Sequence, residues 1–137
     1  MRVKKFLPVL LVFLIGVLAG VLFVLPGFQK RTDVYLQDFS VSGNGSVVTL
    51  QTFTIGSMGF IRSMETKQIG NDIHCSFYCT FGGLNSGFGA KSRFEIRLED
   101  SAKAAESIYF DRAYSDQLVL ERDADTGVWT SVSPLPQ

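Results

Sequence analysis

The side chains best suited to chemistry lie close together in the middle of the chain. Cys75 and Cys79 are the two cysteines, and His74, the one histidine, precedes the first of them. If this part of the chain is exported, two cysteines in it would usually suggest a disulfide. Four residues along a strand span about 13 Å, however, whereas a disulfide needs Cα atoms within about 7 Å of each other. We therefore predict no disulfide and expect two buried thiols that act as small apolar side chains.

A metal or catalytic centre built on these residues is not favoured. On a strand, His74 lies on the face opposite the cysteines, and a zinc site would lack a fourth ligand. The chain has no nucleophile elbow and no evident pair of catalytic carboxylates. A Ser or Asp could be brought to His74 only by the fold, which the sequence does not exclude. We predict a non-enzymatic protein with no metal and no cofactor.

A glycine-rich segment at residues 82–89, GGLNSGFG, is the strongest candidate for a binding loop. Backbone N–H groups of such a loop can hold an anion. The segment matches neither a phosphate-binding loop nor a dinucleotide fingerprint, so a tight connection that uses positive φ angles is the alternative. If the loop binds a ligand or partner, Asn85, Phe88 and Lys91 are the expected contacts. Residues 56–60 form a second candidate loop.

Two further motifs are interpreted as turns. Asp123 and Asp125, in the segment DADTG, have too few oxygen ligands around them for a calcium loop and predict a hairpin. Asn44-Gly45-Ser46 has the form of a glycosylation sequon, but Asn-Gly is also the strongest short hairpin signal.

The first element that positions these residues is an uncharged apolar stretch, residues 6–28. A bilayer core about 30 Å thick needs roughly 20 apolar residues in a helix, so this stretch predicts a transmembrane segment in contact with lipid. Pro8 is expected in the first helical turn, and Pro26-Gly27 should end the helix. Gly16 and Gly20 form a GxxxG pattern, which would allow close helix pairing or a helix-mediated dimer; glycine is also simply common in membrane helices.

Flanking charge predicts the orientation of this segment. Arg2, Lys4 and Lys5 precede it and Lys30 and Arg31 follow it, so the positive-inside rule favours a cytoplasmic N-terminus. The alternative is a cleaved signal peptide with a cleavage box at residues 17–19. The stretch is longer than the usual apolar region of about 7–15 residues in signal peptides, which favours an uncleaved signal anchor. In both cases the C-terminal part is exported and reaches the cell envelope.

The exported part has a different charge from the rest of the chain. From Asp33 onward there are eight Lys or Arg and thirteen Asp or Glu, a net charge of −5 (8 − 13). Nucleic-acid binding needs a basic face, so nucleic acid is excluded as a partner. About a hundred residues suffice for one small domain.

Hydrophobic alternation predicts that this domain consists of strands. Residues 73–81 alternate with a period of two: Ile73, Cys75, Phe77, Cys79 and Phe81 on a buried face, His74, Ser76, Tyr78 and Thr80 on the other. Residues 92–99 alternate in the same way. The other predicted strands are residues 33–41 with a bulge near Gln37-Asp38, 46–55, 60–69, 107–111, 117–122 and 128–132. Residues 101–106 are predicted to form one helical turn.

These strands, separated by turns every 8–12 residues, predict a mainly β, antiparallel, immunoglobulin-like sandwich. The expected organisation is a basic cytoplasmic stub (1–5), a transmembrane signal anchor (6–28), a linker (29–32), the exported sandwich (33–132) and a tail (133–137).

Four segments also carry a resemblance: 57–64 (SMGFIRSM), 77–96 (FYCTFGGLNSGFGAKSRFEI), 108–112 (IYFDR) and 118–129 (LVLERDADTGVW). They resemble a group of small, single-span exported proteins of clostridial-type Gram-positive bacteria. The resemblance covers most of the exported domain and implies a location and a fold; it implies no activity and no catalytic residue. Cys75 and Cys79 depart from the ordinary strand formers expected in that central strand.

Together these observations predict a single-pass membrane protein with a non-enzymatic binding module outside the cell membrane. Its partner would be a protein or a cell-wall component, bound by loops at one end of the sandwich. One alternative is an accessory subunit that assembles through Gly16 and Gly20. A second alternative is a hydrolase of envelope polymers.

Overall fold

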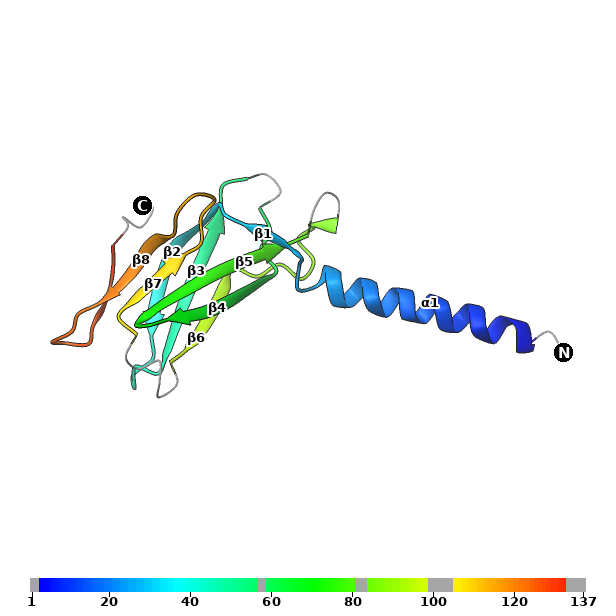
Figure 1. Cartoon of the computed structure of the whole chain (residues 1–137), viewed down its shortest axis with the longest axis horizontal. Helices are drawn as coiled ribbons and strands as arrows, with labels where there is room; N and C mark the ends of the chain where they lie inside the picture. The colour runs from blue at the N-terminus through cyan, green and yellow to red at the C-terminus, as the bar shows by residue number, and fades with distance from the viewer. Residues whose placement is uncertain (1–2, 57–58, 81–83, 99–104, 133–137) are drawn as a thin grey trace.

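A computed structural model describes residues 3–56, 59–80, 84–98 and 105–132 of the 137-residue chain. Its first element is the helix α1 (Val3–Val24), which projects from a β-rich domain (Figure 1). Residues Phe6–Val24 are long and apolar enough to cross a membrane and are not buried by the protein; a signal sequence has the same character. Pro8 lies inside α1, beyond the first turn where it was expected, because the helix begins at Val3.

The chain leaves α1 through a tight connection to the β domain. Gly27 has a φ of +80°, and a Cβ at this position would lie 2.8 Å from the backbone of Cys79. The next amide, Phe28 N–H, donates to the Cys79 carbonyl at 2.9 Å. Only glycine combines this φ with so close an approach to another strand. The end of the apolar segment at Pro26-Gly27 is thus fixed against the domain.

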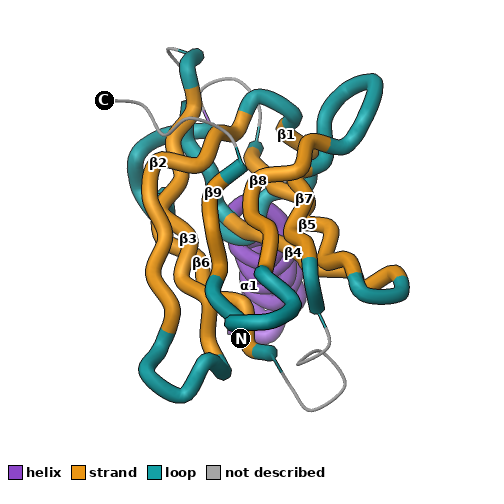
Figure 2. Tube along the Cα trace, turned by 90° about the vertical axis from the view of Figure 1, so that its left-hand side faces the viewer, coloured by secondary structure: helices purple, strands orange, loops and turns teal. Residues whose placement is uncertain are grey.

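The β domain contains two sheets. The larger comprises β1 (Gln29–Arg31), β4 (Ser63–Ile69), β5 (Asp72–Cys79), β7 (Ser107–Phe110), β8 (Gln117–Arg122) and β9 (Trp129–Ser131). The smaller has the order β2 (Val34–Val41), β3 (Val47–Thr54) and β6 (Arg93–Arg97). Figure 2 looks along α1 and shows the two sheets facing each other, with α1 behind them.

The larger sheet is mixed, which corrects the expectation of an antiparallel fold. β5 pairs with β4 along one edge. Its other edge is shared: β1 pairs antiparallel with Phe77–Cys79, and β7 pairs parallel with Asp72–Cys75. β7 follows β6, which belongs to the opposite sheet. No hairpin therefore joins β5 directly to β7, and the two strands can run parallel. Every other described strand pair is antiparallel.

Most predicted strands are confirmed, with small differences at their ends. The register of β2 against β3 shifts between Leu36 and Asp38, as the predicted bulge requires. The strand expected over residues 60–69 begins at Ser63, and the expected linker contains the strand β1. Thr80 is buried, because the alternation of β5 ends at Cys79. Phe81 and most of the predicted turn at 101–106 lie outside the described residues.

One core lies between the sheets. Val48 and Leu50 of β3 and Phe94 and Ile96 of β6 meet inward-facing side chains of β5, β7 and β8. Phe77 lies at the centre, with its ring centroid 5.6 Å from Phe94 and 4.8 Å from Phe110, both in edge-to-face geometry. Such geometry is favourable for aromatic rings beyond the area they bury. The period-two pattern of residues 73–79 therefore buries the face that the sequence predicts.

Candidate binding surface beside the apolar helix

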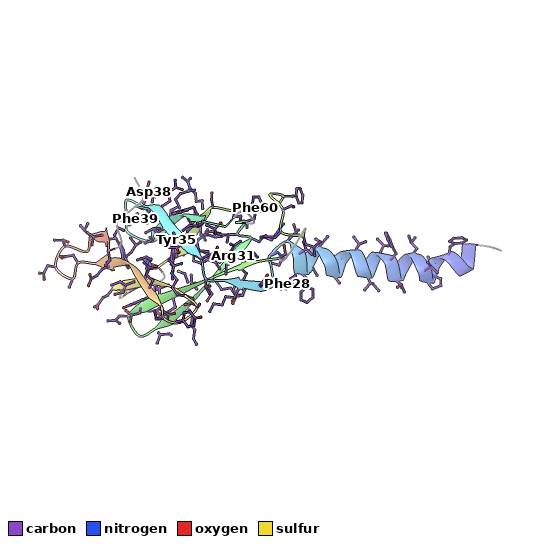
Figure 3. The ribbon with its side chains drawn as sticks, turned by 90° about the horizontal axis from the view of Figure 1, so that it is seen from above. Phe28, Arg31, Tyr35, Asp38, Phe39 and Phe60 are labelled. Atoms are coloured by element: carbon purple, nitrogen blue, oxygen red, sulfur yellow. The ribbon has the colours of Figure 1, made fainter. Side chains whose placement is uncertain are left out.

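The described residues of both candidate loops, Gly56, 59–60 and 84–89, lie toward the end of the β domain that carries α1 (Figure 1). A cleft of about 410 Å³ is lined on one side by Gly59–Ile61 and on the other by Ala90–Ser92. Lys91 N–H donates to the Ile61 carbonyl at 2.8 Å, which ties the two segments together. Figure 3 shows Phe28 and Phe60 at this end, with Asp38 and Phe39 farther from α1. We call residues 59–62 and 84–91 the helix-proximal surface.

Arg62 is the buried cation of the helix-proximal surface. The residue is 2% exposed, and its Nη2 donates to the carbonyls of Leu84 at 3.0 Å and Ser86 at 3.1 Å. Its Nε and Nη1 are buried without a hydrogen-bond partner among the described residues. A Cβ at Gly89, whose φ is +76°, would lie 3.0 Å from Nη1 and 3.4 Å from Leu25 Cδ2. The guanidinium therefore holds the glycine-rich loop in place, close to the end of the apolar helix.

A second, more apolar groove of about 480 Å³ separates this loop from α1. The helix contributes Val17, Gly20, Val21 and Val24 to the groove, and Leu25, which follows the helix, also lines it. The loop contributes Leu84, Ser86 and Phe88, and Arg62 completes the lining. Phe88 is 80% exposed, so a large aromatic side chain stands at the groove with little protein around it.

The predicted contact residues have different environments. Phe88 and Lys91 are exposed, whereas Asn85 is buried and reaches a ligand only if the loop opens. A Cβ on Gly16 or Gly20 would meet nothing within 4 Å, so this side of α1 is sterically open. The structure thus brings Phe88 and Gly20 to one groove, a relation between loop and helix that the sequence analysis did not anticipate.

Among the described residues, carboxylates meet His74 in a polar cluster on the outer face of the larger sheet. His74 Nδ1 lies 2.8 Å from Asp116 Oδ2 and 4.0 Å from Asp111 Oδ1, and its ring stacks on Tyr109 at 5.0 Å. Ser76 Oγ donates to Asp111, and Lys30 Nζ lies 2.7 Å from the same carboxylate.

This cluster does not have the order of a nucleophilic triad. The Ser76 hydroxyl donates to the Asp111 carboxylate rather than to His74, and this carboxylate, paired with Lys30 and with a lowered pKa, is a weak base. His74, Asp111 and Asp116 have donor atoms within 4.8 Å of one another, a spacing that a metal ion could bridge. The Lys30 ammonium already supplies the positive charge to Asp111. The arrangement therefore acts as an ion-pair network on the described face of the sheet.

The ion-pair network also shifts the pKa values of Asp111 and Lys30. Burial alone would raise the pKa of Asp111, but hydrogen bonds from Lys30 and Ser76 outweigh it and hold the pKa below its ordinary value. The hydrogen bond to Asp111 raises the pKa of Lys30. No local sequence pattern indicates this network, because Lys30 and Asp111 are 81 residues apart.

Both cysteines lie buried on the inner face of β5, as predicted. Burial raises the pKa of the Cys75 thiol and that of the Cys79 thiol. Because the thiolate is the reactive form of cysteine, these thiols are poor nucleophiles. Their contribution is to packing.

Comparison with protein-family models, with curated proteins and with solved structures gives no match for this chain.

Proposed function

We propose that the protein is a single-pass membrane protein whose β domain binds a component of the membrane or of its immediate surroundings, without catalysing a reaction. In this proposal α1 is an uncleaved anchor, the N-terminus is cytoplasmic and the domain lies outside. The observation that carries the proposal is the position of the helix-proximal surface. The glycine-rich loop selected for binding lines a groove together with the apolar helix, so a partner in or at the membrane reaches it most easily.

The immunoglobulin-like fold, the resemblance to exported proteins and the choice of ligand also belong to this proposal. An immunoglobulin-like sandwich fits the facing sheets but not the parallel β5–β7 pair. The resemblance to single-span exported proteins of clostridial-type bacteria agrees with the anchor. A cell-wall ligand is less well supported than a membrane component, because the candidate loops are on the end nearest to α1.

The second candidate is an accessory subunit that pairs through α1. It is supported by the open space at Gly16 and Gly20, where a neighbouring helix could approach closely. Gly16 does not line the groove beside the loop, so Gly16→Leu should weaken assembly in this case and leave binding by the loop intact. Hydrolysis of envelope polymers is the weakest candidate, and a His74→Ala variant with unchanged function would contradict it.

Photo-crosslinking in the native membrane tests these proposals. One photoreactive residue replaces Phe88, another replaces Leu18 on α1, and a control replaces Ala124, which is exposed in the β8–β9 turn. An adduct at position 88 alone supports the binding module, and an adduct at position 18 alone supports the accessory subunit. Adducts at the control position alone contradict both. The intact mass of the membrane-bound protein reports whether the anchor is retained.

A further inference from the structure

The groove between α1 and the glycine-rich loop combines apolar walls with a cation that lacks a counter-charge. Among the described residues no carboxylate forms an ion pair with Arg62; Arg31, by contrast, lies 2.5 Å from Asp33. Two backbone carbonyls satisfy only Nη2 of Arg62. A buried charge without an opposite charge is unfavourable, so this site favours the approach of an anion.

The apolar part of the groove extends along the helix. Val17 and Leu25 are eight residues apart, which is about 12 Å at 1.5 Å per residue. Within the groove Val21 is 44% exposed and Leu25 42%, whereas Phe23 on another side is 66% exposed. The domain therefore leaves a narrow strip of α1 beside the loop that is partly shielded but not filled.

The position of this strip decides the chemistry of the occupant. If α1 spans the bilayer, its C-terminal turns lie in the outer part of one leaflet, where acyl chains meet phosphate groups. Arg62 lies at the domain end of the strip, and exposed Leu84 and Phe88 stand beside it. An amphipathic ligand with an acyl chain below and a phosphate above matches this order of apolar wall and cation. A soluble anion would leave the apolar wall uncovered.

We propose that this groove binds one anionic phospholipid, with an acyl chain along Val17–Leu25 and the headgroup phosphate at Arg62. The inference rests on the proposed membrane anchor. In the structure Nε and Nη1 are buried and Gly89 lies close to Nη1, so the lipid binds with an outward movement of residues 84–89. Phosphate oxygens then replace the carbonyls of Leu84 and Ser86 as acceptors and also reach Nη1. Arginine is well suited to such bidentate contacts with phosphate.

Native mass spectrometry of the full-length protein tests this proposal. The protein, in a detergent without phosphate, receives equal amounts of phosphatidylglycerol and phosphatidylcholine with identical acyl chains. We expect about tenfold preference for phosphatidylglycerol, which corresponds to about 1.4 kcal/mol. Both lipids carry a phosphate, but phosphatidylglycerol is a net anion, whereas the choline cation of phosphatidylcholine offsets the phosphate charge next to Arg62. Arg62→Gln should lose this preference. The matched control Arg93→Gln removes an exposed charge from β6, gives the same net charge and should keep it.

Three results would overturn the lipid site: equal binding of the two lipids, an equal loss in both variants, or displacement of the lipid by millimolar glycerol phosphate. If Arg62→Gln does not fold, a photoreactive residue at Phe88 in vesicles containing both lipids decides instead. An excess of phosphatidylglycerol adducts supports the site, and adducts with a second protein copy or with phosphatidylcholine in equal amount contradict it. The intact mass separates the two failures, because a chain without residues 1–19 refutes the anchor, whereas an intact chain without selectivity refutes only the lipid site.

Discussion

At the scale of single residues, Gly27 is the position on which the connection between helix and sheet depends. Its φ of +80° and its approach to the Cys79 backbone are two separate constraints. Gly45, in the β2–β3 turn, has a similar φ of +71° but nothing within 4 Å of its Cβ position. The two glycines therefore separate the cost of a left-handed backbone from the cost of a steric clash.

Gly27→Ala should destabilise the domain more than Gly45→Ala. The positive φ alone costs an alanine about 1–2 kcal/mol, and at Gly27 the clash with strand β5 adds to this. Urea unfolding of the full-length chain in detergent, followed by the fluorescence of the buried Trp129, gives both free energies of unfolding. Equal losses for the two variants would show that Gly27 does not pack against β5.

The ion-pair network predicts a pH dependence. The pKa of Asp111 is lowered in the folded protein, so its contribution to stability is complete above the ordinary Asp value of about 3.9 and is lost as pH falls through the lower, folded pKa. Asp111→Asn should lower the melting temperature at pH 7 and make little difference at pH 2. The control Asp125→Asn removes an exposed carboxylate and should change little at either pH. A gap between wild type and Asp111→Asn that persists unchanged at pH 2 would contradict this role.

The core makes a simpler prediction. Phe77 is 1% exposed and contacts aromatic rings from both sheets, so Phe77→Ala should lower the free energy of unfolding by about 3–5 kcal/mol. Phe88→Ala removes the same atoms from an 80% exposed position and should change it by less than about 0.5 kcal/mol. Urea unfolding measures both. A large loss for Phe88→Ala would mean that its ring supports the fold rather than standing free at the groove.

At the scale of elements, the strands with regular alternation could be predicted and those without it could not. β5 and β6 each bury one face, so their side chains alternate in type, and β8 has the predicted bounds. β1 is only three residues long and contains Lys30 and Arg31, which gives no alternation to detect. The parallel pairing of β7 depends on how the chain passes between sheets, which no local pattern records.

In the candidate site, too, some features could be predicted from a local sequence pattern, whereas others depend on the fold. Glycine content identified the loop, and Phe88 and Lys91 are exposed on it. Arg62 was missed, because an arginine between Ile61 and Ser63 resembles any charged residue at the start of a strand. Its burial results from contacts with Leu84 and Ser86, more than twenty residues away. The groove could not be predicted, since it requires the position of the helix relative to the loop.

The strand β1 predicts resistance to proteolysis between helix and domain. A flexible linker would be cut rapidly by trypsin after Lys30 or Arg31. Pairing of these residues with Tyr78 and Phe77 should instead make cleavage there slow in the folded protein and fast after denaturation. Mass spectrometry of the early fragments identifies the sites. Rapid cleavage after Lys30 in the folded protein would mean that residues 29–31 do not form a stable strand.

At the scale of the whole molecule, α1 and the β domain form an arrangement with a clear polarity. The turns after β2 and β8 lie at the end of the domain opposite α1 (Figure 1). The helix-proximal surface lies next to α1. If α1 remains in the membrane, the glycine-rich loop faces the bilayer surface and the β8–β9 turn faces away from it. Binding of a membrane component by the glycine-rich loop depends on this orientation.

Quenching by brominated lipids tests the orientation most directly. A Phe88→Trp, Trp129→Phe variant carries its one tryptophan in the loop, and the wild type, with Trp129 in β9, is the control. Both are reconstituted in vesicles whose lipids are brominated near the headgroup. We expect strong quenching of the tryptophan in the loop and little quenching of Trp129. Equal, weak quenching of both would show that the loop does not face the bilayer and would refute binding at the membrane surface through this loop.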